Sequence, residues 1–203
     1  PGIRERLEAT ERAADAGADA ALVVTPFYFD HDDAALEAYY REVADASPVP
    51  VYLYSVPAYT GVKLDPETAG SLAAHPNVAG MKDSSGDLTA FQRTRERTAD
   101  ADFELFVGSG GVFAPALDAG ADGGILAVSN VVPERASEIA ELHTAGEDEA
   151  ARDVNRRVLD LDHAVTAEYG VPGLKAAMRS RGQPAGTVRS PHRPVGDDVE
   201  AAL

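Results

Sequence analysis

The 203-residue sequence lacks cysteine entirely, which excludes disulfides, thiol nucleophiles and thiolate metal sites. It has no apolar run near the roughly 20 residues that a membrane-spanning helix needs, and its amino end shows no signal-peptide pattern. Positive charge is also scarce, because 18 basic residues stand against 34 acidic ones and give a net charge of −16. This balance argues against nucleic acid and anionic membrane surfaces as partners.

The remaining composition is that of a globular protein. Hydrophobic residues make up 44% of the chain, and its length suits a domain that can bury a real core. The acids are spread along the chain and lysine is nearly absent, which favours a protein adapted to very high salt, where screening weakens self-repulsion. An ordinary acidic cytosolic enzyme is the alternative, and we expect a cytoplasmic location in either case.

Short apolar runs rich in β-branched residues alternate with amphipathic stretches. Continuous apolar runs are typical of parallel strands covered on both faces, and strands that alternate with helices predict βα units. The sequence therefore predicts an α/β fold. The expected strands cover residues 19–29, 49–56, 78–81, 103–107 and 123–128.

Helix signals agree with this pattern. A first helix is expected over residues 3–16, Asp65 and Asp87 can cap two further helices, and Pro133 can begin another. Residues 147–182 read as helical, followed by a proline-containing tail and a short helix from Asp197. We expect a partial (β/α) barrel over residues 1–146 and a helical extension packed on it over residues 147–203.

Periodicity alone leaves two parallel architectures open, a piece of a closed (β/α)8 barrel and an open doubly wound sheet. In both, active sites form at the carboxyl ends of the strands. All five predicted strands end in small polar, glycine or tyrosine residues, which indicates one shared pocket. These strand ends are the segments 25–28, 54–57, 82–84, 108–111 and 129–130.

Lys82 is the strongest single candidate for chemistry. It is one of three lysines in the chain and ends an apolar run just before a polar turn. A primary amine can form a Schiff base with a ketone, which arginine cannot. Burial at a strand end would favour the neutral amine that this reaction needs, although a structural lysine is the alternative.

Tyr54 ends the preceding strand, where a phenol could relay protons, although a core tyrosine is the alternative. The glycines around Gly108 give a substrate room to approach the backbone, and they lack the spacing of a phosphate-binding loop. The five histidines are scattered without ligand spacing. We therefore expect neither a metal site nor a cofactor.

Four segments resemble the dihydrodipicolinate synthase and N-acetylneuraminate lyase family. Together they run through essentially the whole chain in the family's order. The resemblance implies a TIM (β/α)8 barrel, of which this chain covers about strands 4–8 and the carboxyl-terminal helices. The segments are residues 18–28 (ADAALVVTPFY), 52–62 (YLYSVPAYTGV), 80–88 (GMKDSSGDL) and 120–131 (GADGGILAVSNV).

The resemblance implies a class I aldolase that binds or releases pyruvate. Lys82 would form the imine, Tyr54 would shuttle the proton, and Tyr28 would join the proton relay, often across a subunit interface. Gly108 and Ile125 would line the pyruvate pocket. Ser84, Ser109 and Tyr59 are candidates to contact the aldehyde half. The expected partners are pyruvate, an aldehyde and further copies of the chain, in a dimer or a tetramer.

The sequence also departs from the family pattern. The family's Gly-Thr-Thr-Gly-Glu segment is absent, so we expect the chain to be an amino-terminally truncated piece that is inactive or poorly folded by itself. Tyr59 stands where synthases usually carry a carboxylate-binding arginine. Gly110 and Gly111 stand where sialate lyases usually carry two acids.

These departures favour a lyase acting on a sugar acid of the 2-keto-3-deoxygluconate type. The alternative within the family is 4-hydroxy-tetrahydrodipicolinate (dihydrodipicolinate) synthase. The alternative outside it is an inactive fragment or a non-catalytic ligand-binding α/β domain, which could dock to a separate chain bearing the missing strands.

Overall fold

The computed structural model describes residues 2–203. The chain forms two compact units. We call residues 1–107 and 119–123 the strand unit, and residues 108–118 and 124–203 the helical unit. The predicted boundary between residues 146 and 147 divides the chain differently and stays a prediction. Within the described residues, no helix combines the length and the apolarity that crossing a bilayer requires.

One five-stranded sheet organises the first part of the chain, with its strands in sequence order β1-β2-β3-β4-β5. The pairs β1–β2, β2–β3 and β3–β4 are parallel. This arrangement confirms the α/β fold and is that of a partial (β/α) barrel. The strands are β1 (Ala21–Val24), β2 (Val51–Ser55), β3 (Val78–Asp83), β4 (Glu104–Val107) and β5 (Gly123–Gly124).

Two strands are shorter than the sequence predicts by four residues or more. Within the run 19–29 only β1 forms a strand. Pro26 follows the end of β1 and has no N–H to donate to a neighbouring strand, so the pairing stops there. The run 123–128 yields only the two residues of β5. The chain beyond β5 turns into η2 (Val128–Asn130), where the Ser129 hydroxyl donates to Leu126 O and so competes with strand pairing.

Strand register separates two faces of the sheet. Tyr54 lies opposite Lys82, and Ser55 lies opposite Asp83. Because side chains alternate along a strand, Tyr54 and Lys82 share one face, which we call the lysine face. The other face, which we call the helix face, carries the side chains that are 0–2% exposed, namely Val23, Leu53, Met81 and Leu105.

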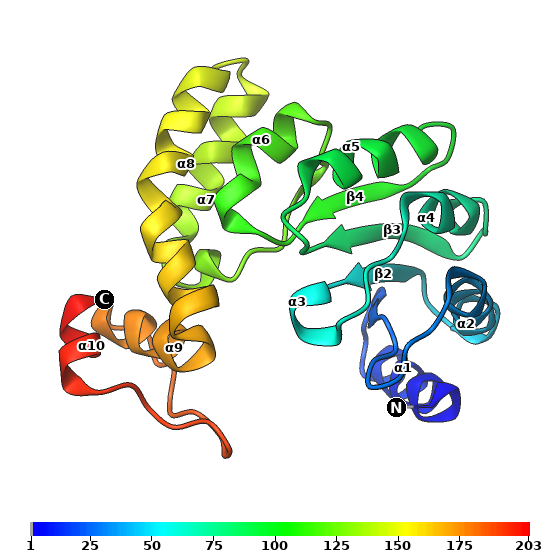
Figure 1. The fold of residues 1–203 in the computed structure, drawn as a ribbon, viewed down its shortest axis with the longest axis horizontal. Coiled ribbons are helices and arrows are strands. Elements are labelled where there is room, and N and C mark those ends of the chain that lie inside the picture. The colour runs from blue at the N-terminus through cyan, green and yellow to red at the C-terminus, as the bar shows by residue number, and fades with distance from the viewer. Residues whose placement is uncertain (1) are drawn as a thin grey trace. The chain divides into compact units, whose positions relative to one another are not determined.

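Three helices lie side by side along the helix face (Figure 1). They are α2 (Asp33–Ala46), α4 (Pro66–Ala73) and α5 (Leu88–Arg97), while α1 (Ile3–Asp15) packs on α2 and the short α3 (Pro57–Thr60) follows β2. The carboxylates of Asp65 and Asp87 accept from the first turns of α4 and α5. Both predicted caps and the predicted first helix are confirmed.

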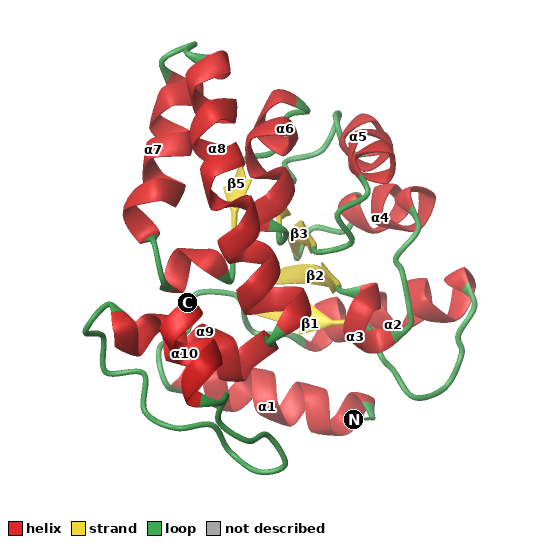
Figure 2. Ribbon diagram, turned by 60° about the vertical axis from the view of Figure 1, so that its left-hand side comes forward, coloured by secondary structure: helices red, strands yellow, loops and turns green. Residues whose placement is uncertain are grey.

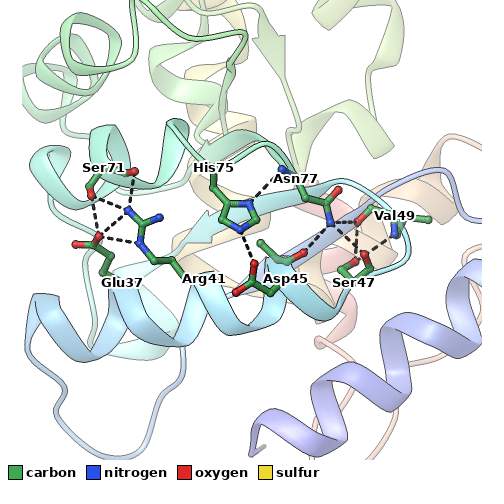
Figure 3. A network of polar contacts seen from close by, with 9 residues as sticks. Glu37, Arg41, Asp45, Ser47, Val49, Ser71, His75 and Asn77 are labelled. Carbon is green, nitrogen blue, oxygen red and sulfur yellow. Dashed lines mark hydrogen bonds and ion pairs between the residues drawn. The ribbon is translucent and has the colours of Figure 1, made fainter.

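Polar contacts hold α2 to the segment that enters β3 (Figure 3). The Asn77 side chain donates to Ala44 O at 2.8 Å and to Ser47 O at 3.1 Å. The His75 ring meets Asp45 Oδ1 at 3.0 Å. These contacts satisfy carbonyls at the end of α2, and they fix the connections at the end of the strands opposite Lys82.

The helical unit is built on α7 (Pro133–Thr144) and α8 (Asp148–His163), which pack side by side (Figure 2). The predicted helical stretch 147–182 is confirmed, although a π-helical turn, η3 (Ala164–Glu168), separates α8 from α9 (Gly170–Ser180). The short helix predicted from Asp197 is α10 (Asp197–Ala202). The remaining elements are η1 (Gly110–Val112) and α6 (Phe113–Asp118).

Candidate active site

Lys82 and Tyr54 meet on the lysine face of the sheet. The register places them directly opposite each other on β3 and β2, and Lys82 Nζ lies over the Tyr54 ring, 4.4 Å from its centroid. Both side chains are half-buried. An amine and a phenol therefore stand together at the carboxyl end of two parallel strands, which is where βα-barrel chemistry occurs.

Asp83 is the neighbour of Lys82 in sequence and lies on the opposite face. Its side chain is only 4% exposed, and its Oδ1 accepts from Ser85 N at 2.7 Å. Burial raises the pKa of Asp83, while the Ser85 hydrogen bonds and the Lys63 charge act in the opposite direction. The alternation of side chains along β3 thus keeps this carboxylate off the lysine face.

The turn after β3, residues 83–87, is called here the serine loop. Ser84 N donates to Ser55 O at 2.9 Å, which prolongs the β2–β3 pairing by one step. Asp87 caps α5 and pairs with Lys63 at 2.7 Å. The Ser84 hydroxyl is buried and has no hydrogen-bond partner among the described residues. It remains a candidate to meet a ligand.

Tyr59 lies in α3, in the loop that follows β2, and is 76% exposed. The Ser55 hydroxyl on the helix face accepts from Leu64 N at 3.2 Å, and Thr60 Oγ1 donates to Val56 O at 3.1 Å. These contacts close the loop that carries Tyr59. Its role in contacting substrate stays a prediction.

Tyr28 is placed differently from the Lys82–Tyr54 pair. It is 88% exposed and is the one described non-glycine residue with a left-handed backbone, at φ 87°. Such conformations cost energy and are often retained for function. Tyr28 and its neighbours Phe27 and Phe29 line a cavity of about 610 Å³, to which neither Lys82 nor Tyr54 contributes.

Gly108 and Ser109 begin the segment after β4, residues 108–111, which we call the glycine loop. Two side chains on α8 hold it. Asn155 donates to Gly110 O at 2.8 Å and accepts from Ala114 N at 2.7 Å, and Asp162 accepts from Gly111 N at 2.9 Å.

The sequence did not single out Asn155 or Asp162. The feature that could have identified them is the position of two polar residues on the apolar face of α8, which also carries Ala151, Val154 and Val158. Of the remaining candidates, Ile125 directly follows β5 and is 42% exposed. Gly108, Ser109 and Ile125 belong to the helical unit, and their roles stay predictions.

Among residues 2–203, one group of side chains could in principle hold a metal ion, namely Asp118, His143 and Asp148. His143 Nδ1 lies 2.9 Å from Asp148 and 3.6 Å from Asp118. Arg152 occupies the other oxygen of Asp118 at 2.8 Å. Because a guanidinium already neutralises this carboxylate, the group is explained as an ion-pair network at the ends of α6, α7 and α8.

A parallel sheet of βα units with candidate catalytic residues at the carboxyl ends of its strands is the arrangement of the (β/α)-barrel enzymes. The chain matches the model of the Dihydrodipicolinate synthetase family over residues 1–203, and it belongs to that family. The family's enzymes are lyases of the class I aldolase type, which confirms the predicted enzyme class.

Three relatives illustrate the match. The chain is 37% identical over 199 residues to a 4-hydroxy-tetrahydrodipicolinate synthase of Methanothrix thermoacetophila, covering 98% of this chain and 68% of the relative. It is 39% identical over 203 residues to a DapA-like lyase of Halobacterium salinarum, covering 100% of this chain and 66% of the relative.

The third relative is a solved structure, the chloride-inhibited dihydrodipicolinate synthase of Acinetobacter baumannii complexed with pyruvate. It superposes with a TM-score of 0.91 at 30% identity, over 99% of this chain and 69% of that one. The chain thus spans about two thirds of the length of these relatives.

Proposed function

We propose that the protein carrying this chain is a pyruvate-dependent lyase in which Lys82 forms an imine with the keto acid. The observation that carries the proposal is the position of the Lys82 amine over the Tyr54 ring at paired strand ends. The pyruvate complex of the Acinetobacter relative supports the choice of keto acid.

The chemistry follows from an amine beside a phenol. The neutral Lys82 amine adds to the keto carbon of pyruvate, and the resulting carbinolamine loses water to give the protonated imine. Tyr54 would carry protons to and from the carbinolamine oxygen. The imine withdraws electrons, so the methyl group can lose a proton to give an enamine. The enamine carbon then bonds to the carbonyl carbon of an aldehyde, and hydrolysis of the product imine frees Lys82.

For the second substrate we propose the reaction named for the synthase relatives, 4-hydroxy-tetrahydrodipicolinate formation. The identity of 37% to one such synthase supports this alternative over the sugar-acid lyase that the sequence favoured. The sugar-acid reaction remains the second candidate, because the chain carries Tyr59 where the resemblance leads us to expect an arginine. A phenol can hydrogen-bond a hydroxyl but supplies no charge for a carboxylate.

Borohydride reduction in the presence of pyruvate tests the imine directly. We expect the full-length gene product to gain one reduced pyruvate on the peptide that contains Lys82. The Lys82→Arg variant should take up no label, and its kcat should fall by at least about a thousandfold. Lys63→Arg, which preserves the ion pair with Asp87, is the matched control and should keep both. A non-catalytic ligand-binding domain would take up no label at all.

The two candidate reactions differ in the aldehyde consumed. We expect the enzyme that has not been treated with borohydride to turn over pyruvate with aspartate semialdehyde, which supplies the carbons and nitrogen that the synthase product adds to pyruvate. Turnover of pyruvate with glyceraldehyde, and none with aspartate semialdehyde, would select the sugar-acid lyase. Tyr59→Arg should then shift kcat/KM toward the carboxylate-bearing aldehyde.

We also propose adaptation to high salt, a homo-oligomer and a cytoplasmic location. The net charge of −16 and the relative from Halobacterium support the first of these. Screening by salt at about 1 M shortens the range of charge repulsion to about 3 Å. The midpoint of thermal unfolding should therefore rise with KCl concentration. A midpoint that falls between low salt and 1 M KCl would contradict the proposal.

A further inference from the structure

The backbone of the glycine loop approaches α8 too closely for side chains. A Cβ at Gly110 would lie 2.5 Å from Asp162 Oδ1 and 2.8 Å from Val128 Cγ1. The Asp162 carboxylate therefore fills the space that a side chain at position 110 would take. It supplies from α8 a polar group that the loop itself lacks at this point.

The two anchors on α8 act on the loop together. Asn155 and Asp162 lie seven residues apart, which is about two helical turns, so both point from one face of the helix. They are 3% and 7% exposed. Asn155 binds Gly110 O and Ala114 N, and Asp162 binds Gly111 N.

These contacts decide which backbone groups of the loop stay available. Gly110 O and Gly111 N are turned toward α8, and Ser109 O accepts from Val112 N at 3.4 Å. The hydrogen bonds from α8 involve Gly110 O and Gly111 N and reach neither Gly108 nor Ser109, the two residues expected to meet substrate. The anchors therefore set the orientation in which that part of the loop is presented.

Burying a carboxylate as such an anchor costs free energy. Burial raises the pKa of Asp162, and the N–H groups of Gly111 and Gly110 offset only part of that cost. Asp162 Oδ1 is buried without a hydrogen-bond partner among the described residues. A position selected only for stability would favour an uncharged group here, since an unpaired buried oxygen costs free energy.

We propose that Asp162 is a positioning residue, which together with Asn155 holds the glycine loop in the conformation that presents the Gly108 backbone to the keto acid. The inference rests on the proposed function, because it takes the Gly108 backbone as part of the pyruvate pocket. Asp162 acts through the loop and does not touch the reacting atoms.

The test compares Asp162→Asn with Asp160→Asn in the full-length gene product. Both variants remove one negative charge from α8, but Asp160 is exposed. The asparagine oxygen can still accept from Gly111 N, but this neutral hydrogen bond is weaker than the one to a carboxylate. For Asp162→Asn we therefore expect a less firmly held loop and a KM for pyruvate raised about tenfold, with kcat changed less than twofold. Exchange of the Gly111 amide hydrogen should also become faster. Asp160→Asn should match the parent in all three measurements.

A melting temperature distinguishes positioning from a purely structural role. Because Asp162→Asn removes a buried charge, its midpoint should be no lower than that of the parent at pH 7. A midpoint well below the parent, or an unchanged KM for pyruvate, overturns the proposal. If the parent enzyme takes up no borohydride label at Lys82, the proposed function fails first. If the parent enzyme takes up the label and Asp162→Asn leaves the KM for pyruvate unchanged, only the proposed role of Asp162 is overturned.

Discussion

The serine loop and the glycine loop follow neighbouring parallel strands, yet they are held in opposite ways. In the serine loop the polar side chains of Asp83, Ser85 and Asp87 bond to amides two or three residues away. In the glycine loop the corresponding contacts come from Asn155 and Asp162, which lie 45 and 51 residues further along the chain than the loop residues they bind.

This difference has a physical origin in what each loop must leave open. A loop with its own Asp and Ser side chains can close Asx-type turns without help. A loop of glycines leaves its backbone accessible but gains no local hydrogen bonds from glycine side chains, and it loses more chain entropy on ordering. Its order therefore has to come from an element that is already fixed, which here is the buried face of α8.

The comparison implies that removing a side chain that anchors the glycine loop lowers the unfolding free energy more than removing one that anchors the serine loop. Asn155→Ala leaves Ala114 N buried without its partner, at about 1–3 kcal/mol, and takes one of two donors from Gly110 O, which still accepts from Phe113 N. We expect a loss of about 2 kcal/mol in unfolding free energy, measured by urea denaturation. Arg157→Ala, on the exposed side of the same helix, is the control and should stay within about 0.5 kcal/mol of the parent.

The same contrast explains what could be predicted from the sequence. The serine loop was readable because its signals are local: a lysine at the end of an apolar run, then Asp87 at a helix cap. The pairing of Lys82 with Tyr54 also followed, since consecutive parallel strands of βα units tend to be neighbours. Both signals depend on residues close in sequence or on a simple topological rule.

The parts that escaped prediction depend on distant or competing contacts. The anchoring of Gly110 and Gly111 by α8 could not be read from the loop, whose glycines show only that something approaches closely. The short β5 was missed because its glycines and the side-chain bonds of Ser129 outweigh an apolar run that reads as a strand. Tyr28 was expected within a strand segment and lies beyond it, after the ladder has ended.

Removing an anchor of the serine loop should cost less than removing Asn155. Asp87→Ala deletes the cap that accepts from Ala90 N at 3.0 Å and an exposed ion pair with Lys63. We expect a loss of about 1 kcal/mol, nearly all of it from the cap, because exposed ion pairs contribute little. Asp87→Asn keeps a capping oxygen and loses the charge, so it should recover most of the stability. A loss from Asp87→Ala as large as that from Asn155→Ala would break the comparison.

The smallest expected effect is a gain in stability, and it concerns Asp83, the buried side chain that anchors the serine loop. Burial raises the pKa of Asp83 above its ordinary value of 3.8, so the folded state holds its proton more tightly than the unfolded state. The contribution of Asp83 to stability therefore falls as pH rises from 3.8 through the raised folded value. Asp83→Asn keeps an oxygen for Ser85 N and removes the charge. It should raise the unfolding free energy at pH 7 by no more than about 1 kcal/mol.

The gain from Asp83→Asn should shrink toward zero as pH approaches 3.8, where Asp83 is protonated in both states. Urea midpoints measured from pH 7 downward would show this trend. Asp19→Asn, at an exposed carboxylate, is the control for general relief of repulsion in a chain of net charge −16. If the two variants gain equally at pH 7, the burial of Asp83 carries no separate cost. If Asp83→Asn loses stability at every pH, its charge is part of what holds the serine loop, and the two loops are more alike than their contacts indicate.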